Sequence, residues 1–338
     1  MNRLRPTQSK LPMFVEILSQ WFGQAQQGLF EAVVQPLVFA LGGGSLLEDA
    51  FDATGWLLVG LIQLAVMLAV IAPLQRWRPA QAIRDRHAVR IDVIYTLIQR
   101  LGLFRVAMFF AFDPLWNDLW GWLAVHNVSG FQLDALLAPL WPGVTDTALA
   151  SFVVYLLAFD FLWYWIHRGQ HQFEWWWSLH ALHHSQREMT MWTDNRNHLL
   201  DSALVDILLV QVGHLIGVPP GQFVAVVAVS QLVENLSHAN LRLSFGGLGE
   251  RLLVSPRYHR LHHGIGIGHE SQGKGTLGGH NFSILFPIWD VLFGTASFAD
   301  RYEATGIRDQ LPEEGARNYG EGFWEQQWLG LRRLVGRA

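Results

Sequence analysis

The sequence predicts an all-α integral membrane protein, a helical bundle that carries a histidine-rich di-metal cap on its cytoplasmic side. Three observations support this fold class. Only 15% of the 338 residues are charged and 51% are hydrophobic, whereas soluble domains carry about 25% charged residues. Several apolar runs approach the roughly 20 residues that a helix needs to cross a bilayer. Thirteen of the 15 histidines lie between His167 and His280, next to segments that contain arginine.

The N-terminal half contains three segments that can enter the membrane. Residues 28–41 form a short apolar run that includes one glutamate, so this run fits either a span or an interfacial helix. Residues 56–74 contain one glutamine and no charge, which predicts a full span because a soluble helix seldom needs to be apolar on every face. Residues 92–112 fit a span or an interfacial helix, and they include Arg100 and Arg105, which must face protein, water or the interface.

The C-terminal half contains further apolar segments. Residues 147–166 are apolar and aromatic except for Asp160, whose carboxylate we expect to face the protein interior, and they lead directly into the first histidines. Residues 203–217 and 222–235 form an apolar pair separated by the turn GVPPG, which predicts a hairpin that enters the membrane and returns. Residues 323–335 fit an amphipathic surface helix.

Basic residues indicate the orientation, because short cytoplasmic loops retain lysine and arginine. Such residues precede residue 11, are absent over residues 11–75, and are dense over residues 76–90. They are absent again over residues 106–166 and resume at Arg168. This pattern predicts four passes, with the N-terminus and the histidine region both on the cytoplasmic side.

Composition and charge limit the organisation and the chemistry. We expect an N-terminal membrane-helix region (1–145), a histidine-rich catalytic domain (146–298) and a polar C-terminal tail (299–338). The N-terminus lacks the pattern of a cleavable secretory signal, so none is expected. The absence of cysteine excludes disulfides, thiolate zinc sites, iron–sulfur clusters and a cysteine nucleophile. A formal charge of -4 and a pI near 6.4 argue against a nucleic-acid partner.

Three histidine clusters indicate a metal site. They are His167 and His171 in HRGQH, His180, His183 and His184 in HALHH, and His259, His262 and His263 in HRLHH. Residues three and four apart share one face of a helix, so each cluster can direct several imidazoles at one point. Neutral imidazole binds iron, zinc, copper and nickel, and the spacing alone does not select the metal. So many histidines exceed the needs of one ion, which predicts two metals.

Further polar residues extend the candidate site. Glu234 and His238 lie four residues apart at the end of the apolar hairpin, where both would complete the metal site. Alternatively, Glu234 would accept a hydrogen bond that fixes the tautomer of a histidine ligand. Asp160 lies two helical turns before the first cluster, and we expect it to orient a ligand or to pair with Arg168. Two further candidates for a supporting role are His198 and His280.

These motifs resemble those of the fatty acid hydroxylase superfamily, which includes sterol desaturases, sterol methyl oxidases, sphingolipid hydroxylases and alkylglycerol monooxygenase. The resemblance covers residues 160–295 and consists of DFLWYWIHRGQH, WWSLHALHHS, SHANLRL, SPRYHRLHH and HNFSILFPIWDVLFGT. It implies a membrane fold with a cytoplasmic di-metal cap that uses iron and dioxygen to oxidise lipid C–H bonds.

The resemblance also implies a ligand set. The implied ligands are His167, His171, His180, His183, His184, His238, His259, His262 and His263. Glu234 stands where some relatives have a histidine, so either the carboxylate replaces that ligand or one metal position is open. Asn281 begins the sequence Asn-Phe-Ser where relatives often have Asn-Tyr-Gly, so we expect a supporting role for Asn281 rather than a direct catalytic one.

The sequence therefore predicts a membrane-bound di-iron oxygenase that hydroxylates or desaturates a lipid, with two iron ions for which zinc can substitute. The expected partners are the membrane, a lipid substrate, dioxygen and an external electron donor, because the chain has neither cysteine clusters nor a nucleotide-binding glycine motif. A zinc-dependent lipid hydrolase is the alternative, since the same ligands can activate water. A metal transporter is a weaker alternative, because its ligands would be distributed through the spans.

Overall fold

The computed structural model describes residues 13–266 and 279–337, and within these ranges the chain forms helices and no β-strand. The residues before residue 11, on which the expectation about a secretory signal rests, lie outside the described residues. The α-helices are α1 (Met13–Leu29), α2 (Gln35–Ala40), α3 (Leu47–Val66), α4 (Ala72–Trp77), α5 (Arg86–Arg100), α6 (Leu103–Val125), α7 (Leu133–Leu137), α8 (Ala148–Gln172), α9 (Glu174–His184), α10 (Leu199–Ile216), α11 (Pro220–Ser237), α12 (Gly246–Leu252), α13 (Pro256–His262), α14 (Ile288–Leu292) and α15 (Phe323–Leu334).

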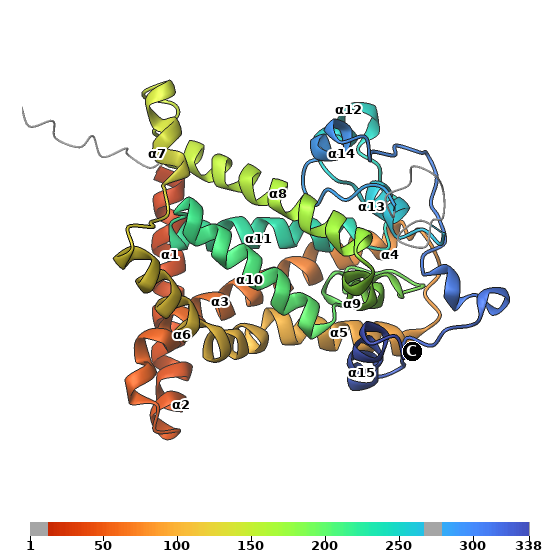
Figure 1. Ribbon diagram of the computed structural model, residues 1–338, viewed down its shortest axis with the longest axis horizontal. Helices are drawn as coiled ribbons and strands as arrows, with labels where there is room; N and C mark the ends of the chain where they lie inside the picture. The colour runs from red at the N-terminus through yellow and green to blue at the C-terminus, as the bar shows by residue number, and fades with distance from the viewer. Residues whose placement is uncertain (1–12, 267–278, 338) are drawn as a thin grey trace, which may run out of the picture.

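The described residues contain three helical stretches that are long and apolar enough to cross a membrane, namely Gly44–Trp77, Ala148–Gln172 and Leu199–Ile216. A fourth candidate combines α5 with the first part of α6, and these two helices meet at 54°. In Figure 1, α3, α8, α10 and α11 run side by side as a bundle. Large apolar side chains such as Leu61, Val153 and Leu208 are exposed on these helices, as a lipid environment requires. The predicted all-α membrane bundle is confirmed.

Two predicted segments differ in detail from a simple span. Residues 28–41 belong to the helix that α1 and α2 form together, which is not among the candidate spans of the described chain and runs across the end of the bundle (Figure 1). Its glutamines and its two glutamates suit an interfacial position better than hydrocarbon. The segment 92–112 is broken at Gly102, whose φ of 78° lies in the left-handed region. The break turns α6 away from the direction of α5.

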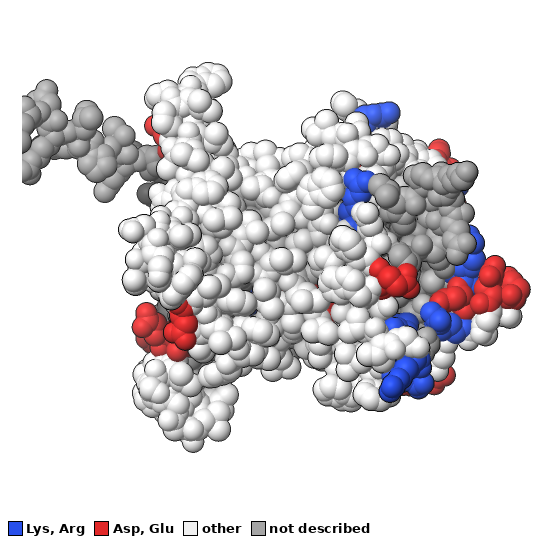
Figure 2. All heavy atoms as spheres, viewed as in Figure 1, with Lys and Arg blue, Asp and Glu red and all other residues white. Residues whose placement is uncertain are grey.

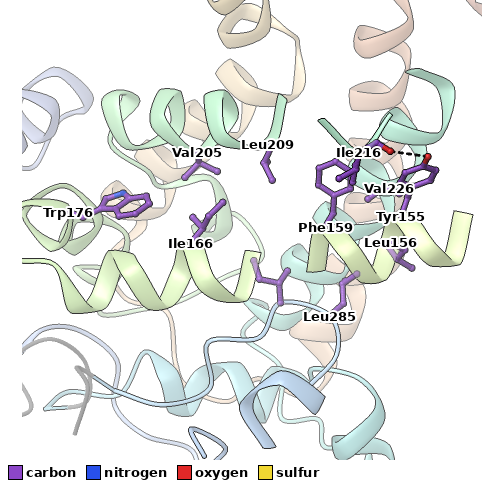
Figure 3. Packing of buried hydrophobic residues seen from close by; sticks show 11 residues of the cluster. Tyr155, Leu156, Phe159, Ile166, Trp176, Val205, Leu209, Ile216, Val226 and Leu285 are labelled. Atoms are coloured by element: carbon purple, nitrogen blue, oxygen red, sulfur yellow. Dashed lines mark hydrogen bonds between the residues drawn. The ribbon is translucent and has the colours of Figure 1, made fainter. Parts of the chain in front are cut away.

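The apolar hairpin is present as α10 and α11, and both helices pack against α8 (Figure 3). The core between them includes Phe159 of α8, Leu209 of α10 and Val226 of α11. The hydroxyl of Tyr155 donates a hydrogen bond to the backbone oxygen of Ile216 over 3.3 Å, which ties α8 to the end of α10. Because α8 carries the first histidines, this core fixes their position.

The opposite end of the bundle from α1 collects the short helices and the C-terminal segment. We call this part the cap; it comprises the described residues of 174–198 and 238–337. In the cap, α15 packs against α9 and α5, with the rings of Phe323 and Tyr95 4.6 Å apart. Buried Asp92 of α5 accepts a hydrogen bond from Arg196 over 2.8 Å. The Lys and Arg side chains visible in Figure 2 gather at this end.

Candidate metal centre

Nine buried histidines from four helices meet where the bundle joins the cap. They are His167 and His171 in the last turns of α8, His180, His183 and His184 in the last turns of α9, His238 directly after α11, and His259, His262 and His263 in α13 and at its end. The helical spacing places the members of each cluster on one face, as the sequence predicts. All nine histidines of the predicted ligand set are therefore brought together.

The histidines form two groups in which the ligand nitrogens lie within 4.8 Å of one another. Group one contains His167, His171, His180 and His184, and group two contains His183, His238, His259 and His263. His262 forms a third set with one member of each group, His184 and His263. The HALHH motif is thus divided, because its outer histidines belong to group one and its middle histidine to group two. This division offers two candidate metal positions next to each other.

Backbone carbonyls fix the tautomer of three histidines. The Nδ1 atoms and their carbonyl partners are His167 with Phe282 at 2.8 Å, His238 with Glu234 at 2.7 Å, and His262 with His280 at 2.7 Å. A carbonyl oxygen only accepts hydrogen bonds, so each of these Nδ1 atoms carries the proton. Each Nε2 atom therefore presents a lone pair toward the centre of the site.

The inward-facing nitrogens fit metal ions. In group two, Nε2 of His238 lies 3.1 Å from Nε2 of His183 and 2.9 Å from Nε2 of His259. Buried Nε2 atoms without a hydrogen-bond partner among the described residues belong to His180, His184 and His262. Buried acceptors of this kind are costly when nothing satisfies them. Bound metal ions would satisfy them, so the donor set fits two ions held by imidazole.

Burial keeps several of the clustered histidines neutral. Loss of hydration lowers the pKa of His183, His184 and His259 well below the ordinary histidine value, and neighbouring imidazoles lower it further. The same causes lower the pKa of His262 and His263. Neutral imidazole is the form that binds a metal. At neutral pH these rings can therefore bind without first losing a proton.

Asp201, in the first turn of α10, organises group one, although the sequence did not identify it. Its carboxylate accepts hydrogen bonds from Nε1 of Trp176 over 2.7 Å and from Nε2 of Gln170 over 2.9 Å. It also lies 3.2 Å from Nδ1 of His180. A carboxylate on Nδ1 orients a metal-binding ring and makes its Nε2 a stronger donor. A lone acid at the start of an apolar helix was the available signal, but 21 residues separate it from His180.

Asp160 supports a ligand indirectly. Its carboxylate accepts hydrogen bonds from the backbone N–H of Leu285 over 2.9 Å, from the backbone N–H of Phe286 and from Nε1 of Trp289 on α14. Leu285 and Phe286 belong to the loop before α14. That loop carries the carbonyl of Phe282, which holds His167. Arg168, the alternative partner, donates to a tyrosine hydroxyl one turn earlier in α8. The carboxylate thus positions a metal-binding ring through the loop.

The remaining supporting candidates have different contacts. His280 provides the carbonyl that holds His262, and the side-chain amide of Asn281 donates to two backbone carbonyls of the cap. These two residues therefore stabilise the turn behind group one. Nε2 of His198 lies 2.8 Å from the carbonyl of Gln327, so this ring anchors the C-terminal helix α15 and lies away from both histidine groups.

Glu234 lies outside both histidine groups. It holds the tautomer of His238, as one alternative predicted, but through its backbone carbonyl and not through its carboxylate. Its half-buried side chain lines the pocket next to the histidines. Metal binding by the Glu234 carboxylate stays a prediction.

A pocket leads from the histidine groups into the bundle. It is partly open and is lined by residues of α3, α5, α6, α8, α10 and α11. His167 of group one and both His183 and His259 of group two form part of its wall. A molecule in this pocket would therefore contact both groups.

Residues 152–295, which contain all nine histidines, match the family model described as fatty acid hydroxylase. The matched region covers less than half of the chain, and over it the chain is similar to the fatty acid hydroxylase superfamily. The ornithine lipid hydroxylase of Rhizobium tropici is 28% identical over 71% of this chain and 67% of its own length. The alkylglycerol monooxygenase of Caenorhabditis elegans is 26% identical over 47% of this chain and 29% of its own length.

A very-long-chain aldehyde decarbonylase of Oryza sativa subsp. indica is 25% identical over 63% of this chain and 32% of its own length. The chain thus spans two thirds of the bacterial relative but only about a third of the other two. No solved structure matches it significantly. In this chain, α3, α5 and α6 precede the matched region yet line the pocket. The histidine groups therefore lie in the region that the family model matches, while part of the pocket wall lies outside it.

Proposed function

We propose that this protein is a membrane-bound di-iron oxygenase that hydroxylates or desaturates a lipid C–H bond. The observation that carries the proposal is the pair of adjacent buried histidine groups. Backbone carbonyls hold the Nδ1 atoms of His167, His238 and His262 from outside, which leaves their Nε2 atoms free to face the site. The similarity to an ornithine lipid hydroxylase and to an alkylglycerol monooxygenase supports the same class of reaction.

The proposed reaction requires electrons from outside the chain. Iron bound by the two groups would supply dioxygen reduction and the removal of hydrogen from an unactivated carbon. Hydroxylation takes up one dioxygen, two electrons and two protons and releases the alcohol and one water, whereas desaturation releases the alkene and two waters. Because the sequence contains no cysteine and no nucleotide-binding glycine motif, we propose that a separate protein donates the electrons.

The side chains of this protein would bind the metal ions, orient the histidine rings and shield the reacting carbon from water. The nine histidines would hold the ions, and Asp201 and the Phe282 carbonyl keep the rings His180 and His167 in place. The pocket would receive the lipid from the bundle side and separate the reacting carbon from bulk water. To position a single carbon, the protein needs fixed histidine rings and a pocket that is partly closed to solvent.

We further propose that the cap faces the cytoplasm. In the view of Figure 2, Lys and Arg side chains of the described residues gather on the cap, and none is visible at the opposite end. Cytoplasmic loops of membrane proteins retain positive residues. The charge distribution therefore supports the cytoplasmic position that the sequence predicts for the histidine region. The sequence also predicts a cytoplasmic N-terminus, but α1, the first described helix, lies at the end opposite the cap (Figure 1).

The alternatives fit the centre less well. Catalytic zinc sites of hydrolases usually have three protein ligands and an open fourth position, whereas each group here offers four histidines and His262 lies between the groups. A transporter would carry its ligands along the spans. Here the nine histidines gather at one end of the bundle, so an oxygenase centre remains the best-supported function.

Metal analysis of the detergent-purified protein tests the proposal. We expect about two iron ions per chain after anaerobic reconstitution, and dioxygen consumption coupled to lipid oxidation when a reductant is added. His183→Ala and His184→Ala remove one donor from different groups, so each variant should lose about half of the iron or more. Mass spectrometry of the metal content measures this loss.

His214→Ala is the matched control, because His214 lies on α10 against Trp120 and outside both groups. This variant should retain its iron. Stable zinc in place of iron, together with lipid hydrolysis that needs no dioxygen, would contradict the oxygenase and favour the hydrolase.

A further inference from the structure

An arginine and an aspartate form a charged pair in the wall of the pocket. Arg105, near the start of α6, pairs with Asp206 of α10, and their Nη1 and Oδ1 atoms are 2.9 Å apart. The two side chains keep 24% and 14% of their surface exposed, and both line the pocket. Ionisable side chains within membrane-spanning segments are costly and usually serve a function. This pair is therefore a candidate for substrate recognition.

The break between α5 and α6 places the arginine in the wall. The left-handed Gly102 separates the two helices, which meet at 54°. The guanidinium of Arg105 then lies 4.2 Å from the ring centroid of Trp56 on α3. A cation–π contact from α3 and an ion pair from α10 hold the guanidinium from two helices. A charge held in this way is positioned before any ligand arrives.

The other arginine of this segment has a different environment. Arg100 is only 3% exposed, and it donates to Asp194 over 3.2 Å and to Asn235 over 3.1 Å. These contacts connect α5 to α11 and to the loop that follows α9, so Arg100 stabilises the fold. The Arg105–Asp206 pair instead keeps surface toward the pocket and can accept a ligand without breaking such a network.

Other side chains of the wall are also polar, and they include Gln99, Ser202 and Gln231. An oxygenase that oxidised the middle of an acyl chain would bind that chain most tightly in an apolar pocket. Polar groups that face methylene groups lose hydration without gaining hydrogen bonds. A wall with amides, a hydroxyl and both charge signs suits a polar head group. The histidines of both groups line the same pocket, so a lipid bound at the pair would share this pocket with the histidine groups.

We propose that this pocket recognises lipids with a zwitterionic head group, whose carboxylate pairs with Arg105 and whose ammonium group pairs with Asp206. The inference rests on the proposed function and names its substrate class. A ligand with both charges leaves neither member of the pair without a partner when it enters, whereas a ligand with one charge leaves one buried charge uncompensated.

Binding of matched probes tests this proposal without turnover. The iron-loaded protein in lipid nanodiscs is titrated anaerobically, without reductant, by calorimetry against empty nanodiscs. N-dodecanoyl-lysine carries both charges, N-dodecanoyl-norleucine lacks the ammonium group, and N-(5-aminopentyl)dodecanamide lacks the carboxylate. The wild-type protein should bind the first probe about ten-fold more tightly than either of the others, because each charged contact contributes roughly one such factor.

Two single variants assign each charge to its partner. Asp206→Asn should remove the preference for the lysine probe over the norleucine probe, and Arg105→Gln should remove its preference over the aminopentyl probe. Both variants should retain their iron, since neither residue belongs to the histidine groups. Arg90→Gln, which removes an exposed positive charge of α5 outside the pocket, should leave all three affinities unchanged.

Equal binding of the three probes by the wild-type protein would overturn the proposal, and this comparison does not depend on the folding of any variant. A uniform loss of affinity for all probes in both variants would also overturn it, because the pair would then be structural. Iron content and dioxygen consumption of the wild-type protein report separately on the proposed function. A failed inference is thereby distinguishable from a failed oxygenase assignment.

Discussion

At the residue scale, the Nδ1 partner of four histidines decides what their rings can do. Carbonyl partners leave His167, His238 and His262 with an Nε2 lone pair, because a carbonyl cannot donate a proton. His180 differs because its partner is the carboxylate of Asp201. The orientation of this ring therefore depends on one side chain and not on the backbone.

Asp201→Asn should weaken metal binding by group one. An amide offers one acceptor oxygen in place of two, so Trp176, Gln170 and His180 cannot all keep their present acceptor. Loss of a partner of this kind typically lowers metal affinity by about 10–100-fold. Iron retained after dialysis against increasing chelator concentrations measures the change.

Asp206→Asn provides the control for this experiment, since Asp206 lies on the same helix but pairs with Arg105. Its iron should be retained at chelator concentrations that strip the Asp201 variant. If both variants lose iron equally, the cause is general damage to α10, and the role given to Asp201 is wrong.

At the element scale, the contact between α3 and the end of α5 shapes the pocket. A Cβ atom on Gly60 would lie 1.7 Å from the carbonyl oxygen of Arg100, so the two helices can approach only because residue 60 has no side chain. Small residues allow this close approach between membrane helices. The contact lies next to the break after α5, so the position of Arg105 depends on it.

Gly60→Ala should destabilise the protein, because the added methyl group must displace a backbone carbonyl. Overpacking of this kind costs about 1–3 kcal/mol, which thermal unfolding in detergent, followed by tryptophan fluorescence, would detect as a lower midpoint. Gly28→Ala is the matched control, since its Cβ meets nothing within 4 Å and alanine improves helix propensity by up to about 1 kcal/mol. The two midpoints should shift in opposite directions; a stable Gly60 variant would contradict the packing argument.

Local sequence patterns predicted some helices, but they did not predict where other helices lie or break. Uninterrupted apolar composition predicted α3 and α8, and the turn GVPPG predicted the α10–α11 hairpin, because these signals lie within one segment. The placement of α1 across the bundle depends on what α1 packs against, which no local pattern contains. The break at Gly102 is similar, since a lone glycine in an apolar segment is compatible with a continuous helix.

At the scale of the whole molecule, the site combines elements that are distant in sequence. Spacing predicted the nine histidines, but their division into two groups depends on how α9 and α13 face each other. The contact between Asp201 and His180, and the pairing of Arg105 with Asp206, likewise require the packed bundle. The sequence therefore predicts which histidines come together better than it predicts which residues orient them or line the pocket.

The charge asymmetry of the molecule predicts which end faces the cytoplasm. The segment between α6 and α7 lies at the end opposite the cap (Figure 1), and the basic side chains visible in Figure 2 gather on the cap. Because the chain contains no cysteine, a single introduced thiol reports on one site alone. Val128→Cys lies in the segment between α6 and α7, and Glu313→Cys lies in the cap; both positions are exposed.

A membrane-impermeant maleimide should therefore label the Val128 variant in spheroplasts and should label the Glu313 variant only after the membrane is permeabilised. Equal labelling of both variants in detergent, with iron content retained, shows that both thiols are accessible in the folded protein. The reverse pattern in spheroplasts would place the histidine centre outside the cytoplasm. Basic side chains would then have to gather on the cap for another reason than membrane orientation, and an electron donor would have to reach the centre from the opposite side.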